Sequence, residues 1–166
     1  MRRERAMELF LEGYNCSQSV FLAFIDYYAM DWETAAKLSS SFGGGMGRLR
    51  EVCGTVSGMF LAAGMIYGYA DPKSPEAKAE HYARIQELAK TFEEKHGTII
   101  CRELLGLTVK REAPTPEERT PEYYKKRPCK ELAGDAAEIL EQYIAAHPVP
   151  GKKEAEEEAD GQSELR

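Results

Sequence analysis

The stretch that decides the fold reads FGGGMGRLREVCGTVSG and occupies residues 42–58. Its glycine-rich first half permits backbone conformations with positive φ and close approach by other groups. Its second half places Cys53 at the start of a long apolar segment. A thiol at the start of a helix lies near backbone N–H groups, which favour a negative charge. We therefore expect the pKa of Cys53 to be lower than usual, so that its thiolate binds a metal or attacks a substrate.

The apolar segment after the glycines covers residues 52–70 and contains no charged residue. Its length is close to the ~20 residues that cross a bilayer. Four glycines and several hydroxyl side chains weaken the case for a membrane span. A helix that is apolar all round also suits the centre of a helical bundle. We expect such a central helix and no membrane contact, with glycines that let neighbouring helices pack closely.

Helical patterns recur on both sides of this segment. Asn15, Asp31, Ser74 and Thr98 each precede an apolar-periodic run, and such side chains cap helix N-termini. We expect further helices over residues 2–12, 16–27, 32–42, 75–96, 99–105 and 129–143. Residues 107–128 hold four prolines among charged residues and predict an irregular connection. Because no strand-like alternation is convincing, the predicted fold is all-α, a compact multi-helix bundle around a central apolar, Gly-rich helix.

The chain has 166 residues, a length that suits one domain. We place an all-helical, cysteine-containing domain at residues 1–147 and a tail at residues 148–166. Residues 152–166 contain six acidic and three basic residues and almost no apolar side chain. This composition predicts an acidic, disordered and flexible tail.

The charge balance limits the classes of partner. The net charge is −6, and no basic patch is interleaved with aromatic residues, so nucleic acid is not an expected partner. The basic start at residues 1–5 is not followed by an apolar run, so we expect a cytoplasmic protein without a secretory signal. In a reducing compartment, cysteines are metal ligands, redox-active thiols or core residues rather than disulfides. The sequence leaves open which electron-transfer or redox partner the protein has and whether it forms a homo-oligomer.

The four cysteines share one kind of position. Cys16, Cys53, Cys101 and Cys129 form no C-x-x-C pair, so the local zinc-finger, ferredoxin and thioredoxin signatures are absent. Each falls within the first turn of an expected helix and joins its apolar stripe. Four helix starts can converge on one electropositive point, which suits thiolates or an anionic iron–sulfur cluster. The alternative is that each cysteine packs in the core as a small hydrophobe.

The order of the motifs adds a resemblance. The motifs are Asn15-Cys16-Ser17-Gln18-Ser19, residues 42–47, residues 53–58, Cys101-Arg102-Glu103-Leu104, and Cys129 before an Ala-rich helix. Together they resemble the redox-active protein family named for its C_GCAxxG_C_C cysteine pattern, over residues 5–145. The chain departs from the literal pattern because Val52 precedes Cys53 and Gly54-Thr55 follow it. Met46 also occupies a place where some relatives have another cysteine.

The resemblance implies a small helical protein of bacteria or archaea with redox or metal-linked cysteines. A related domain occurs in split-Soret-type cytochromes, which hold iron–sulfur as well as haem. Haem is not implied here, because the chain has no C-x-x-C-H motif.

Our first hypothesis is a [2Fe–2S]-like site for electron transfer or redox sensing, with Cys16, Cys53, Cys101 and Cys129 as the metal ligands. The glycines expected to line that site are Gly43, Gly44, Gly45 and Gly47. The second hypothesis is a cluster-free thiol–disulfide protein with Cys53 as the reactive thiol. The third is a structural or interaction protein with zinc-bound or merely buried cysteines.

The side chains around the loop have less specific interpretations. We expect Arg48 and Arg50 either to lower the pKa of Cys53 or to bind an anion at the glycine-rich loop. The alternative is that both side chains face solvent. The loop lacks the Lys-Ser/Thr ending of a P-loop. The three histidines, His81, His96 and His147, are expected at helix ends or on the surface.

Overall fold

A computed structural model describes residues 1–150, and all but the first three residues of the tail expected at residues 148–166 lie outside the described residues. The helices are α1 (Arg2–Leu11), α2 (Cys16–Leu22), α3 (Trp32–Ser39), α4 (Gly43–Met46), α5 (Gly54–Tyr67), α6 (Pro75–His96), α7 (Cys101–Leu104), α8 (Pro121–Lys126) and α9 (Cys129–Ala146). Within residues 1–150, β pairing is limited to one isolated bridge between Val52 and Ile100. The expected all-α fold is confirmed.

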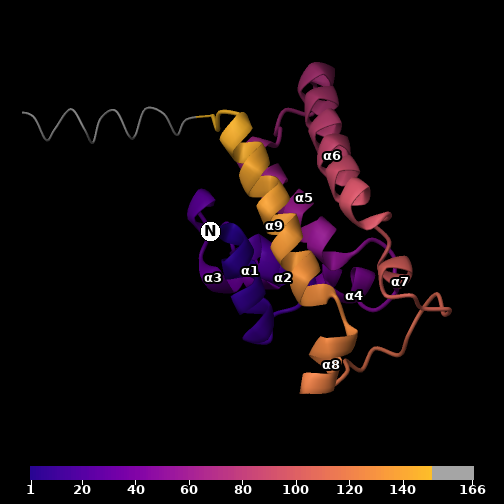
Figure 1. Cartoon of the computed structure of the whole chain (residues 1–166). Coiled ribbons are helices and arrows are strands. Elements are labelled where there is room, and N and C mark those ends of the chain that lie inside the picture. Colours follow the sequence, from indigo (N-terminus) through magenta and orange to yellow (C-terminus); the bar gives the residue numbers. More distant parts are fainter. Residues whose placement is uncertain (151–166) are drawn as a thin grey trace, which may run out of the picture.

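Helix α5 is the centre of the bundle, as the apolar segment predicted. It packs against α2, α6 and α9, while α1 lies along α9 (Figure 1). Val56, Met59 and Ala62 of α5 are completely buried. The helix is shorter than the apolar segment, because Val52 is extended in the bridge and Gly68 caps the end. No helix within residues 1–150 is long and apolar enough to span a membrane.

Most of the expected helix starts are confirmed. The side chain of Asn15 caps α2 in a reciprocal capping box with Gln18, and Asp31 and Ser74 cap α3 and α6. The prediction that Thr98 caps the helix after it is wrong, because the N-cap of α7 is Ile100. The Thr98 hydroxyl instead accepts a hydrogen bond from the Ile100 amide at 3.1 Å.

Glycines in α5 allow α2 to approach closely. A Cβ atom at Gly58 would lie 2.5 Å from the Ser17 carbonyl oxygen and 3.1 Å from the Val20 Cβ. At Gly64, one turn or more further along, a Cβ atom would meet nothing within 4 Å. Gly58 and Gly64 of the same helix therefore have different roles, since of these two only Gly58 is required by packing.

This contrast gives a matched pair of variants. Gly58→Ala is expected to destabilise the fold by about 1–3 kcal/mol, because the added methyl group overpacks the contact with α2. Gly64→Ala is expected to stabilise it by about 0.5–1 kcal/mol, because alanine is the better helix former. Urea unfolding measures both, and equal effects at the two positions would contradict this account of the α2–α5 contact.

Candidate functional site

All four cysteines line one cavity of ≈ 410 Å³. The starts of α7 and α9 lie near α4 and α8, at the lower end of the molecule in Figure 1. Cys16, Cys101 and Cys129 are the first residues of α2, α7 and α9, and Cys53 is the N-cap of α5. All four are free thiols; Cys16 is partly exposed and the other three are buried. The four helix starts therefore surround one cavity, and the role of these cysteines as metal ligands stays a prediction.

The β bridge places Cys53 beside Cys101. The Cys53 amide donates to the Ile99 carbonyl at 2.7 Å, and the Cys101 amide donates to the Glu51 carbonyl at 2.6 Å. In this antiparallel register Cys53 and Cys101 are diagonal neighbours, and their side chains leave the same face. Two cysteines separated by almost fifty positions in the chain are thus fixed by two backbone hydrogen bonds.

Cys16 connects the other thiols. The neighbouring Cys129 thiol and burial raise the pKa of Cys16, and Cys16 in turn adds to the rise in the pKa of Cys53 and of Cys101 that burial causes. The close approach needs Gly54, because a Cβ atom there would lie 2.9 Å from the Cys16 Cβ. The pKa values of Cys16, Cys53 and Cys101 therefore depend on neighbouring thiols, and all four cysteines line the same cavity.

The expectation of a lowered pKa at Cys53 is wrong. Burial raises the pKa of Cys53 to about 12, and the neighbouring Cys16 adds to the effect. The Thr55 hydroxyl, at 3.1 Å from the Cys53 sulfur, lowers the pKa but not enough to compensate. Burial likewise raises the pKa of Cys101, against the opposing effect of Arg50. A helix start lowers the pKa of a thiol only where burial and neighbouring thiols do not outweigh its effect.

The glycine-rich loop forms a left-handed turn. Five consecutive residues, 44–48, have φ between 65° and 68°. The Gly47 amide donates to the Gly43 carbonyl at 2.8 Å, so the turn closes its own hydrogen bond. Glycine adopts this conformation without steric cost, but Met46 and Arg48 each lose about 1–2 kcal/mol in it. Strain of this kind persists only where the surroundings fix it, and here it adjoins the thiols.

Each of the four expected loop glycines lines the cavity: Gly43, Gly44, Gly45 and Gly47. The loop has no room for a side chain at Gly45, where a Cβ atom would lie 2.6 Å from the Cys101 Cβ. At Gly43 the obstacle is the side chain of Asn15, at 2.4 Å. The backbone of Gly44 opposes the rise in the pKa of Cys16 that Cys129 and burial cause. The loop therefore contributes backbone rather than side chains to the site.

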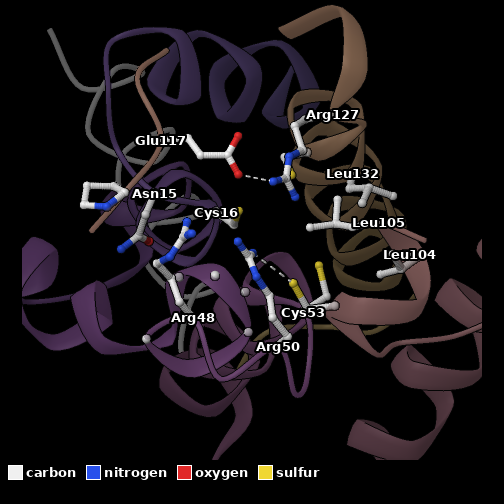
Figure 2. A pocket seen from close by; sticks show the side chains of 18 of the residues that line it. Asn15, Cys16, Arg48, Arg50, Cys53, Leu104, Leu105, Glu117, Arg127 and Leu132 are labelled. Carbon is white, nitrogen blue, oxygen red and sulfur yellow. Dashed lines mark hydrogen bonds and ion pairs between the residues drawn. The ribbon is translucent and has the colours of Figure 1, made fainter. Parts of the chain in front are cut away.

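Four arginines also line the cavity, together with the single carboxylate of Glu117. Arg48 and Arg50 were considered from the sequence, but Arg119 and Arg127 were missed. Arg127 could have been found, because it lies two positions before Cys129. Arg119 lies in the irregular connection, where no sequence pattern links it to the cysteines. Figure 2 shows Arg50 and Arg127 pointing into the space between Cys16, Cys53 and Glu117.

The connection over residues 107–120, which we call the strap, closes one side of the cavity. Pro114, Pro116, Glu117 and Arg119 of the strap belong to its lining. No strap residue belongs to the apolar core. The strap is therefore held by polar contacts.

Those contacts are made by arginines. Arg48 donates to the Ala113 carbonyl at 2.6 Å, and Arg127 forms an ion pair with Glu117. Arg119 donates to the carbonyls of Phe10 at 2.6 Å and Tyr14 at 3.0 Å. The cover of the thiol cavity is consequently electrostatic, and its stability depends on these guanidinium groups.

Other candidate ligands do not join the thiols. No histidine lines the cavity, and His96 instead lies 3.0 Å from the Asp135 carboxylate. Within residues 1–150, no three His, Cys, Asp or Glu side chains are grouped closely enough to hold one metal ion. The cysteines surround a space and do not meet at a point.

The fold and the site define a small all-helical protein with an arginine-rich cavity lined by four thiols. The family described as "Putative redox-active protein (C_GCAxxG_C_C)" matches residues 14–143, and the chain belongs to this family. The resemblance of the cysteine motifs is thereby confirmed. No curated protein and no solved structure matches the chain.

Alanine substitutions in the loop test the left-handed turn. Gly47→Ala is expected to lose about 1–2 kcal/mol, the cost of a left-handed L-residue, because its Cβ atom would have space. Gly45→Ala is expected to lose about 1–3 kcal/mol more, because the methyl group also overlaps Cys101 and the backbone of Arg50. Urea unfolding compares the two variants. Equal losses would show that the loop is not packed against Cys101.

Arginine variants test the strap. Arg119→Gln removes the two hydrogen bonds that the guanidinium donates to backbone carbonyls. Their loss is expected to raise the population of protein with an open strap about tenfold. Labelling of Cys53 by a bulky maleimide, followed by mass spectrometry, measures that opening. Arg111→Gln is the matched control, since the structure gives this exposed strap residue no hydrogen bond or ion pair. Equal labelling rates in the two variants would contradict an electrostatic strap.

Proposed function

We propose that this protein is an electron-transfer or redox-sensing protein whose four cysteines bind a [2Fe–2S]-type cluster. The ligands would be Cys16, Cys53, Cys101 and Cys129. The observation that carries the proposal is that these residues, from four distant segments, all line one cavity. Membership of a redox-active cysteine family supports the same chemistry.

The donor set and the shape of the cavity fit a cluster. Four cysteine thiolates are the usual ligands of [2Fe–2S] clusters. Structural zinc requires four ligands at about 2.0–2.3 Å from one point. Within residues 1–150, however, no three potential ligands are grouped closely enough for one ion. A larger group, which cysteines around a cavity could bind, suits this arrangement better than a single ion.

The charges of the cavity also fit. Iron–sulfur clusters with four thiolate ligands are anionic, and four guanidinium groups line the cavity with the carboxylate of Glu117. Glu112 also pairs with two of them, Arg48 and Arg50, so positive charge is in excess by about two. Hydrogen-bond donors reach individual sulfur atoms: the Thr55 hydroxyl lies 3.1 Å from Cys53, and Arg50 lies 3.5 Å from Cys101. Net charge and donors of this kind set the reduction potential of a cluster. When bound, the cluster supplies a reversible one-electron centre, and the chain holds it, shields it from water and compensates its charge.

A cluster-free thiol–disulfide protein is the second candidate. The disulfide would form between two of the four free thiols that line the cavity. Bond formation would release two protons and two electrons to an external disulfide or other oxidant. Cys53 is poorly suited as the attacking thiol, because burial raises its pKa to about 12.

The test is the visible absorption spectrum of anaerobically purified protein, with analysis of iron and acid-labile sulfide. We expect charge-transfer bands that bleach on reduction, and iron and sulfide in equal amounts. Each Cys→Ser variant is expected to lose most of the iron. Ser17→Ala is the matched control, because its buried hydroxyl lies next to Cys16 and has no hydrogen-bond partner.

The alternatives give different results. Colourless, metal-free protein that loses one pair of titratable thiols on oxidation would replace the cluster with the disulfide chemistry. Stoichiometric zinc in colourless, redox-silent protein would instead assign a structural role to the cysteines. Iron retained in all four Cys→Ser variants would contradict the ligand assignment.

A further inference from the structure

One of the four cavity arginines has a role different from the others. Arg48, Arg119 and Arg127 contact the strap or anchor it to the body of the protein. Arg50 also binds strap residue Glu112, but its Nη1 continues to the sulfur of Cys101 at 3.5 Å (Figure 2). Within residues 1–150, it is the one hydrogen bond that joins a cationic side chain to a thiol.

The position of Arg50 is fixed from several directions. Its side chain is only 6% exposed, and its Nε donates to the Glu112 carboxylate. Its carbonyl accepts hydrogen bonds from the Arg102 amide at 3.3 Å and from the Arg102 guanidinium at 3.2 Å. Its own φ of 58° is a left-handed conformation that costs a non-glycine residue about 1–2 kcal/mol. A charged side chain is held here against both strain and burial, directly beside one thiol.

The sulfur atoms consequently have different surroundings. Cys101 faces a guanidinium, Cys53 faces the neutral hydroxyl of Thr55, and the pKa of Cys16 is affected by the backbone of Gly44. Because solvent screens a buried charge only weakly, the charge of Arg50 acts most strongly at Cys101. The paired Glu112 carboxylate offsets part of this charge, and Arg127 adds to its effect on Cys101.

We infer that Arg50 is a positioning residue that directs positive charge onto Cys101 and raises the reduction potential of the four-cysteine site. The inference rests on the proposed cluster function. Reduction adds one electron from an external donor, and the adjacent guanidinium stabilises the added negative charge. Loss of this guanidinium makes reduction less favourable, while loss of an arginine that does not reach a sulfur has a smaller effect.

The first experiment is a dithionite titration of the iron-loaded protein that measures the midpoint potential. Arg50→Gln is expected to lower the reduction equilibrium about tenfold, which is ~59 mV for one electron. Arg50→Lys keeps the charge and is expected to recover part of the shift. Arg48→Gln is the matched control: this arginine lines the same cavity and pairs with the same Glu112, but has no contact with a sulfur. Equal shifts in the two Gln variants, or no rescue by lysine, would overturn the inference.

A second readout needs no cluster. In iron-free protein, the ratio of alkylation by anionic iodoacetate to alkylation by neutral iodoacetamide reports the local charge at each cysteine. Mass spectrometry resolves that ratio for Cys101 and Cys53. Arg50→Gln is expected to lower the ratio severalfold at Cys101 and to change it less at Cys53, and Arg48→Gln is expected to lower the ratio at Cys101 less than Arg50→Gln does.

The two readouts separate the two claims. A wild-type protein without iron would refute the cluster function, and with it any effect on a cluster potential. The alkylation ratio would still show whether Arg50 places charge on Cys101. An unchanged ratio at Cys101 in Arg50→Gln would overturn the charge placement even in a protein that binds iron.

Discussion

The site depends on two close backbone approaches. The glycine-rich loop approaches the start of α7, and the start of α5 approaches the start of α2. Side chains cannot be accommodated at Gly45 or Gly54, because their Cβ atoms would overlap Cys101 and Cys16 respectively. These approaches, with the bridge between Val52 and Ile100, bring segments far apart in the chain to one cavity. A thiol cavity built in this way depends on backbone contacts more than on side-chain packing.

The loop stores unfavourable energy that the helical core must offset. Met46, Arg48 and Arg50 are left-handed without being glycines, and Arg50 is also almost completely buried. The contacts of α2, α5 and α9 provide a rigid base on which such strain can persist, since they bury Val20, Val56 and Ala136 completely. Backbone conformations that are unfavourable for the residues that adopt them are typical of functional sites. Here such conformations occur beside the thiols and arginines.

The helical framework could be predicted from local signals. Asn15 and the Ser74-Pro75 pair mark helix starts by side-chain chemistry that needs no tertiary context. The pKa of Cys53 could not be predicted, because it depends on burial beside other thiols rather than on its place in the helix. Arg119 was missed for a related reason: the strap that carries it has no periodic pattern, and only the folded chain brings it to the cysteines. The boundary proposed after residue 147 stays a prediction.

The central claim is that the four cysteines share one centre that holds iron. Its most direct test is a crystal structure of anaerobically purified protein, with anomalous diffraction measured at the iron edge. The account predicts a strong anomalous peak inside the cavity, within bonding distance of the sulfurs of Cys16, Cys53, Cys101 and Cys129. A cavity without an iron peak, or a peak bound by side chains other than these cysteines, would contradict it.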